Sequence, residues 1–294
     1  MGDYLLLILS ALMFSGQIIF SKRYETKNGN SFYATACFSL VVSVVCLIYT
    51  LILNGFKIRF EWYSFIIALS YALIHTVSRL ISIKTISLGK VSIYTLFLML
   101  GGMIIPFLVG VTFLGEELKL HYVLAVLLLI VALIIPTLNM GGKKNEQKKG
   151  VSKLFLLLCF ITFILNGTGA SLVKVHQVYS GVKLESNDFT VLFTLISVVA
   201  SLMVFIIASF KRERTNGKEL LVCGGGFGLV HMTGTLIQVI TATRVDGALL
   251  FPLVTGGTLI FTPFLSLLFY KEKIDLTNAI CIALSFIATV IFAF

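Results

Sequence analysis

The chain has 294 residues, of which 58% are hydrophobic and only 12% carry a charged side chain. Soluble domains carry about 25% charged residues and roughly 45–50% apolar ones. The composition therefore excludes a two-domain soluble enzyme, a secreted disulfide scaffold and a nucleic-acid-binding module, although a net charge of +10 would otherwise suggest nucleic acid. It predicts an all-α membrane protein whose surroundings are a lipid bilayer.

Ten apolar segments follow one another along the chain, each close to the length of about 20 residues that a membrane span needs. Charged or turn-forming breaks such as KRYETKNGN (22–30) separate them. We expect ten transmembrane helices at 4–21, 32–53, 63–83, 91–114, 120–139, 153–174, 188–209, 219–241, 248–270 and 275–294.

The longest break, GGKKNEQKKG (141–150), predicts a polar linker at 141–152 between a first half, 1–140, and a second half, 153–294. The halves resemble each other at a nearly constant offset: His75 matches His231, Gly101-Gly102 matches Gly256-Gly257, and Glu117 matches Glu272. This indicates a repeat of five helices. Because five is odd, the second copy enters the membrane from the opposite side, which gives two inverted five-helix repeats.

The stretch SIKTISLGKVSIYTLFLMLGGMIIPFLVGVTFLGEELKL (82–120) resembles the signature of the drug/metabolite transporter superfamily, in its ten-helix, EamA-like branch. Lys84, Pro106 and Gly115-Glu116 stand at the family's lysine, helix-four proline and Gly-Glu turn. The second half repeats this layout with Arg244, Pro263 and Lys271-Glu272, and the resemblance covers essentially the whole chain. Phe14-Ser15-Gly16 departs from it, because the family often has a tryptophan there. The resemblance implies a transporter of small metabolites in the plasma membrane, the inner membrane in a bacterium.

Ionisable side chains inside the spans are the first candidates for substrate binding, because each costs about 2.5–3.5 kcal/mol at the bilayer centre. Arg79 lies well inside the third span, and His75 shares its helix face. Tyr71 shares the face of His75, and Tyr94 begins the fourth span. The alternatives are snorkelling for the arginine, a core hydrogen bond for the histidine and ordinary packing for the tyrosines.

The remaining substrate-binding candidates come from the first helix of each half and from the eighth span. Lysines at the first-helix ends match family lysines, and their alternative is snorkelling at the interface. The polar candidates could equally bridge helices. These residues are Gln17, Lys22, Asn166, Lys174, His231 and Gln238.

Paired glycines, each followed a few residues later by a proline, occupy equivalent places in the fourth and ninth spans. Small residues permit close helix approach in membranes, and proline bends helices. We expect these residues to act in packing and as gating hinges: Gly101, Gly102, Pro106, Gly256, Gly257 and Pro263.

Histidine side chains ordinarily titrate near neutral pH, so His75 and His231 would suit coupling of transport to a proton. Exchange for a counter-substrate is the alternative way to drive transport. The chain has no HExxH and no ATP-binding motif, and its acidic residues all lie in loops or at span ends, so we expect no enzyme, no metal and no cofactor. Its five cysteines lie in apolar runs without a CxxC, which is typical of small packing residues.

These patterns together predict a secondary transporter, monomeric or homodimeric, that works by alternating access through a cavity lined by spans 1, 3, 4, 6, 8 and 9. The basic embedded residues favour a small-molecule substrate such as an amino acid or an organic anion. The alternatives are transport of neutral or cationic metabolites through aromatic contacts, a flippase for lipid-linked intermediates, and a non-transporting subunit. Most of the 23 basic residues lie on the linker side and favour a cytoplasmic linker, whereas the family resemblance implies cytoplasmic termini.

Overall fold

The structure is a computed structural model that describes residues 2–115, 119–138, 152–210, 213–242, 244–245, 247–271 and 276–293. These residues form helices and no strand. The predicted linker, apart from Ser152, and the turn residues Glu116, Glu117 and Glu272 lie outside them. The helices are α1 (Gly2–Asn28), α2 (Phe32–Leu53), α3 (Trp62–Leu88), α4 (Val91–Phe113), α5 (Leu120–Leu138), α6 (Lys153–Val178), α7 (Ser186–Ser209), α8 (Gly217–Ala242), α9 (Gly247–Tyr270) and α10 (Leu276–Ala293).

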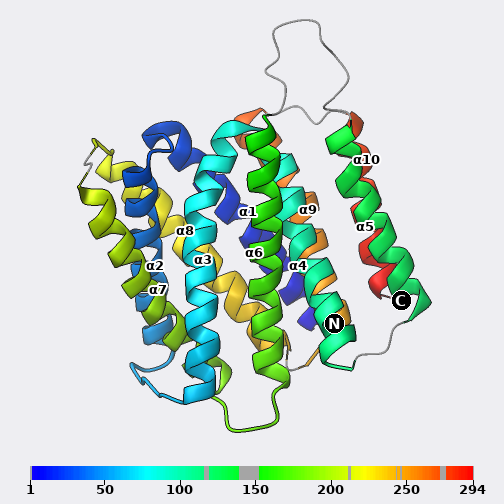
Figure 1. Ribbon diagram of the computed structural model, residues 1–294, viewed down its shortest axis with the longest axis horizontal. Coiled ribbons are helices and arrows are strands. Elements are labelled where there is room, and N and C mark those ends of the chain that lie inside the picture. The colour runs from blue at the N-terminus through cyan, green and yellow to red at the C-terminus, as the bar shows by residue number, and fades with distance from the viewer. Residues whose placement is uncertain are drawn as a thin grey trace, which may run out of the picture.

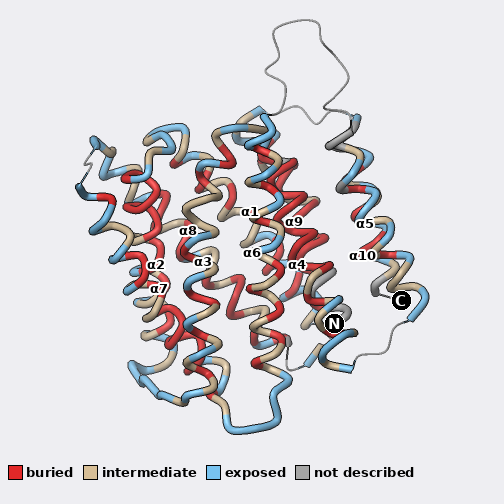
Figure 2. Tube along the Cα trace, in the orientation of Figure 1, coloured by how far each residue is buried: buried red, intermediate tan, exposed pale blue. Residues whose placement is uncertain are grey.

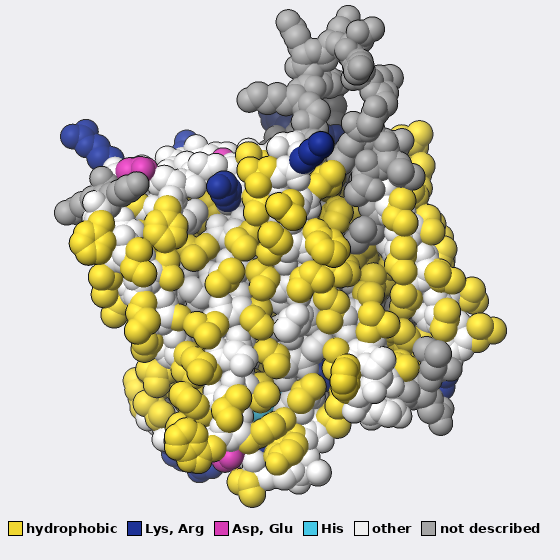
Figure 3. All heavy atoms as spheres, viewed as in Figure 1, with side chains coloured by type: hydrophobic (Ala, Val, Ile, Leu, Met, Phe, Trp, Pro, Cys, Tyr) yellow, Lys and Arg dark blue, Asp and Glu magenta, His cyan; other side chains and the backbone are white. Residues whose placement is uncertain are grey.

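Eight of these helices are long and apolar enough to cross a membrane, namely α1 to α4 and α6 to α9. In α5 and α10 the apolar stretches of described residues are shorter, Leu120–Ala132 and Ala279–Ile291. Figure 3 shows hydrophobic side chains covering the flank of the bundle, with charged side chains at its two ends. A helix satisfies its own backbone hydrogen bonds, which is what a segment surrounded by lipid requires. The chain is therefore a multi-pass helical membrane protein.

Successive helices run in opposite directions through the bundle (Figure 1). The start of α1 and the end of α10 lie at one end, which we call the terminal end. The end of α5 and the start of α6 lie at the other, which we call the linker end. As a result α1 and α6, the first helices of the two sequence halves, point in opposite directions.

Most of the main helix contacts join the first five helices to the last five. The contact of α1 with α8 corresponds to that of α6 with α3, and the contact of α1 with α9 corresponds to that of α6 with α4. Likewise the contact of α2 with α8 corresponds to that of α7 with α3. Three further contacts, α2–α7, α4–α9 and α5–α10, each join two helices that hold the same place in the two sets of five. Neither half therefore buries its polar faces without the other.

The first helix is longer than the sequence analysis predicted, because it continues past residue 21 through a charged segment to Asn28. Two contacts hold this last part. The buried Tyr24 hydroxyl donates to the Ala34 carbonyl at 2.7 Å, and Arg23 forms an ion pair with Glu219 of α8 at 2.9 Å. The helix ends where Gly29 takes a φ of +75°, a conformation that glycine adopts without strain.

Buried positions concentrate where helices face one another and are dense along α4 and α9 (Figure 2). The glycine pairs of these helices lie at close contacts. A Cβ at Gly101 would collide with the backbone of Phe163 in α6, and one at Gly257 would lie 2.8 Å from the Ala11 Cβ of α1. Pro106 of α4 and Pro263 of α9 are buried. The expected packing role is therefore visible, while the hinge role of these residues stays a prediction.

The close contact between α4 and α6 leads to a test of packing. Gly101→Ala should lower the melting temperature in detergent, because overpacking a tight contact costs about 1–3 kcal/mol and the obstacle here is backbone. The matched control is Gly16→Ala in α1, where an added Cβ meets nothing within 4 Å. Equal melting temperatures for the two variants would contradict the packing assignment.

Candidate functional site

A cavity of about 160 Å³ lies between helices of the first half, α1 to α4, and helices of the second half, α6 to α9. The six helices expected from the sequence, α1, α3, α4, α6, α8 and α9, all contribute to its wall. Two further helices, α2 and α7, contribute phenylalanines that the sequence analysis did not anticipate. Of the ten predicted substrate-binding residues, eight line this cavity: Gln17, Tyr71, His75, Arg79, Tyr94, Asn166, His231 and Gln238.

Arg79 is the one permanently charged side chain among the described residues of the cavity wall. Its Nη2 donates to Ser43 Oγ of α2 at 2.9 Å. Ser43 in turn bonds Ser201 of α7 at 2.9 Å, and Ser39 bonds the same hydroxyl at 3.1 Å. The Nε of Arg79 is buried without a hydrogen-bond partner, and no described carboxylate forms an ion pair with the guanidinium. The arginine is thus positioned by hydroxyl groups while its charge is not neutralised.

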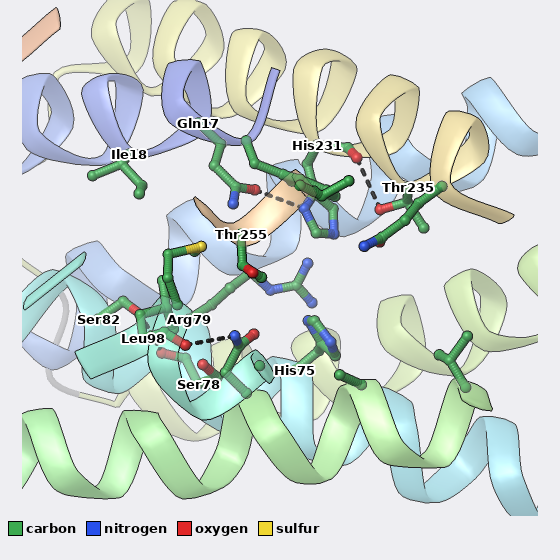
Figure 4. Close-up of a pocket in the computed structure, with 18 of the residues that line it drawn as sticks. Gln17, Ile18, His75, Ser78, Arg79, Ser82, Leu98, His231, Thr235 and Thr255 are labelled. Carbon is green, nitrogen blue, oxygen red and sulfur yellow. Dashed lines mark hydrogen bonds between the residues drawn. The ribbon is translucent and has the colours of Figure 1, made fainter. Parts of the chain in front are cut away.

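The two histidines at equivalent sequence positions meet across the cavity, with ring centroids 6.0 Å apart. His231 Nδ1 lies 2.7 Å from Gln17 Oε1 of α1, and since this oxygen can only accept, Nδ1 carries the proton. Figure 4 shows both imidazoles and the Arg79 side chain pointing into the same space. One histidine from each half of the sequence therefore lies at this site.

Aromatic rings form much of the remaining wall. Tyr71 packs on His75 with a centroid distance of 4.1 Å and meets Phe193 edge-on at 4.8 Å. On the opposite side Phe227 lies 5.6 Å from His231 and 5.5 Å from Phe38. A cationic centre beside aromatic surfaces suits an organic molecule with one charged group and an apolar body.

Two other predicted residues on the wall already have partners in the protein. The Tyr94 hydroxyl donates to Ser82 Oγ at 2.7 Å, and Asn166 Nδ2 donates to the Leu98 carbonyl at 2.7 Å. That amide also lies 2.8 Å from where a Cβ of Gly102 would stand, so the glycine leaves room for it. These contacts favour the helix-bridging alternative for the amide group of Asn166.

The two predicted lysines lie away from the cavity wall. Lys22 Nζ pairs with Glu25 at 3.3 Å and donates to the Ile86 carbonyl at 3.4 Å. Lys174 is only 7% exposed in α6 and is absent from the lining residues that the structure describes. Neither lysine is among the described residues that line the cavity, so the snorkelling alternative fits both better than substrate contact.

Side-chain contacts join the helices at both ends of the cavity. At the linker end Arg23 of α1 forms its ion pair with Glu219 of α8. At the terminal end Ser64 Oγ of α3 bonds His176 Nε2 of α6 at 3.0 Å, and Phe189 stacks on the histidine at 3.9 Å. These two helix pairs correspond to each other in the two halves.

The start of α3 beside this contact is capped by Glu61. Its carboxylate accepts the backbone N–H groups of Ser64 at 2.7 Å and Tyr63 at 2.9 Å. Those two hydrogen bonds, that of Ser64 first, hold the pKa of the Glu61 carboxyl below its usual value of 4.5. The cap fixes the backbone at Ser64, which positions its hydroxyl toward His176.

Several residues of the site escaped the sequence analysis. Ser43, which anchors Arg79, and the phenylalanines of α2 and α7 lie in uniformly apolar spans where nothing in the pattern sets them apart. Ser78 and Thr255 line the wall and are small polar residues of a kind common in membrane helices (Figure 4). Among the described residues no group of three or more His, Cys, Asp or Glu side chains could hold a metal ion.

The serine contacts provide a test of how Arg79 is held. Ser43→Ala should lower the melting temperature more than Ser39→Ala, because only Ser43 accepts from the guanidinium and a lost partner of a buried donor costs about 1–3 kcal/mol. The difference between the two serine variants should disappear in an Arg79→Leu background. A difference that persists there would mean that Ser43 acts independently of Arg79.

Comparison with known proteins concerns the fold. No protein-family model matches the chain, and no curated protein matches it. A solved structure described only as "Crystal structure of protein" superimposes with a TM-score of 0.65 over 99% of this chain and 98% of that chain, at 14% sequence identity. At that identity the likeness shows a shared fold and nothing about function.

Proposed function

We propose that this chain is a secondary transporter of the plasma membrane for small organic metabolites that carry a carboxylate or a similar anionic group. In this proposal the chain has ten spans in two inverted five-helix repeats and is a member of the drug/metabolite transporter superfamily. The observation that carries the proposal is Arg79, a charged side chain on the wall of a cavity between helices, with no described ion-pair partner. Ionisable residues inside a membrane are costly and typically mark a substrate pathway.

The alternating-access part of the proposal draws support from the helix contacts. Each main contact between a helix of the first half and one of the second has a counterpart in which the two corresponding helices meet, as in α1–α8 and α6–α3. Two inverted repeats related by a pseudo-two-fold axis would have this pattern. The cavity lies between the halves, and its two ends are bridged by the corresponding pairs α1–α8 and α3–α6. Opening one bridge while the other stays closed would expose the site to one side of the membrane at a time.

A second candidate is transport of neutral or cationic metabolites through aromatic contacts. It is favoured by the rings of Tyr71, Phe193 and Phe227 on the cavity wall. Cations bind aromatic faces, but a guanidinium on the same wall repels them. We therefore place an anionic group first, with the rings contacting the apolar body of the substrate.

The first test is ligand-induced thermal stabilisation of the purified protein with amino acids, organic acids, phosphorylated metabolites and quaternary amines. A ligand at 100 times its Kd stabilises by about 2.7 kcal/mol. We expect an anionic or zwitterionic compound to raise the melting temperature of the wild type. Arg79→Ala should reduce the shift to less than half, since a charge-assisted hydrogen bond contributes about 1.5–3 kcal/mol.

The control variant is Arg214→Ala, which removes an exposed arginine outside the helices and should keep the full ligand shift. If quaternary amines alone stabilise the wild type, or if Arg79→Ala binds the anion as tightly, the aromatic-cavity function replaces the anion site.

Cross-linking the linker end tests alternating access. The five native cysteines are buried and would first be replaced by serine or alanine. In that background, joining Arg23→Cys to Glu219→Cys with a bis-maleimide should stop counterflow in proteoliposomes but preserve ligand-induced stabilisation, because α1 and α8 can no longer separate. Each single cysteine variant, treated with the same reagent, should keep transporting. Continued counterflow in the cross-linked protein would exclude this end as a gate.

A further inference from the structure

The cavity wall combines one charged side chain with two side chains that can take up a proton. Arg79 is its one permanent charge among the described residues, and His75 and His231 face the same space. Charges interact strongly where the surroundings are apolar, so a second cation beside the guanidinium is disfavoured. Without a bound anion the wall therefore carries one positive charge and two neutral imidazoles.

Both imidazoles keep a nitrogen lone pair that no described side chain occupies. His231 uses its Nδ1 hydrogen for Gln17, which leaves Nε2 as the lone-pair nitrogen. His75 makes ring contacts with Tyr71 and His231, and its Nε2 lies 3.2 Å from where a Cβ of Gly169 would stand. Each ring therefore keeps one nitrogen that can accept a proton, and Gly169 leaves space beside His75.

The described residues of the cavity wall include no acidic side chain that could supply or hold that proton. The titratable groups that face the pair are the Tyr71 phenol and Arg79 from α3 and the Tyr94 phenol from α4. The thiol of Cys46 in α2 lies near Arg79. The other cavity-lining helices, α1, α6, α7, α8 and α9, contribute only uncharged side chains besides His231 among their described lining residues. The imidazoles are therefore the groups that respond to a change in the charge of the cavity.

We propose that the His75–His231 pair takes up one proton from water each time an organic monoanion binds beside Arg79, so that anion and proton cross the membrane together. The inference rests on the proposed function. A hydronium ion or a buffer acid gives up the proton, so its bond to hydrogen breaks as the imidazole N–H bond forms, and the proton returns to the solution when the anion leaves. The positive charges of Arg79 and of the protonated imidazole and the negative charge of the anion sum to +1, which is also the net charge of the empty cavity. The loaded and the empty protein therefore carry the same net charge in the cavity when they change conformation.

The charge of the cavity wall also favours some substrates over others. An organic cation would meet the guanidinium with no carboxylate on the described wall to offset it. A zwitterionic amino acid brings its own ammonium group and would need no proton. The site as built best fits a monocarboxylate whose apolar body contacts the aromatic rings.

The test is titration calorimetry of the full-length protein in detergent with acetate, butyrate, benzoate and 3-phenylpropanoate. Repeating each titration in buffers of different ionisation enthalpy counts the protons taken up. Between about pH 5 and 8 we expect uptake of up to one proton, greatest at the acid end, because Arg79 disfavours a second cation beside it. By reciprocal linkage, the Kd of the anion should rise as the pH rises, by up to about tenfold per pH unit. Phenylalanine, which adds an ammonium to the 3-phenylpropanoate skeleton, should cause no uptake.

Variants assign the proton to the pair. The variant with both His75→Gln and His231→Gln should still bind the anion through Arg79 but take up no proton and lose the pH dependence. The control is His121→Gln, because this histidine lies in α5 and outside the cavity wall. The wild-type proton count keeps the test decisive if the double variant does not fold.

Two failures remain distinguishable. Tight binding of a monoanion by the wild type without proton uptake would overturn this inference and leave the anion site intact. Binding of none of the four monocarboxylates at any pH would overturn the anion site itself, and this inference with it. Equal proton uptake with phenylalanine and 3-phenylpropanoate would contradict the charge argument.

Discussion

The guanidinium of Arg79 has to remain charged inside a bundle whose flank faces lipid, and much of the site is arranged around that requirement. A single hydrogen bond to Ser43 ties it to α2, and the hydroxyl of Ser201 extends the connection to α7. Hydroxyl groups solvate the cation without cancelling its charge, which a carboxylate would do. The bundle thereby holds a positive charge at the cavity and leaves it available to a ligand.

The side chains of the site come from helices of both halves of the chain, so the site lies at the contact between the halves. Arg79 and His75 come from α3 and His231 from α8, and Gln17 of α1 orients the second imidazole. A relative movement of the two groups of helices would change the distances within this set. In the proposed mechanism, binding and conformational change are therefore linked through the same few side chains, because each of them belongs to a helix that packs across the interface.

The two ends of the cavity are held by chemically different contacts. An ion pair joins Arg23 to Glu219 at the linker end, whereas His176 at the terminal end is hydrogen-bonded to Ser64 and stacked on Phe189. An exposed ion pair weakens with ionic strength, while a stacked and buried ring does not. Corresponding helix pairs can thus close the two sides with unequal strength.

The sequence by itself determined the membrane class and the positions of most helices, because an apolar segment in lipid has to satisfy its own backbone hydrogen bonds. It also determined that His75 and Arg79 share a face, since residues four apart always do in a helix. Only the tertiary structure decided that Lys22 and Lys174 lie off the cavity, that Ser43 anchors the arginine, and that α2 and α7 line the wall. A membrane helix is apolar toward lipid and toward its neighbours alike, so its sequence carries little information about which side faces inward.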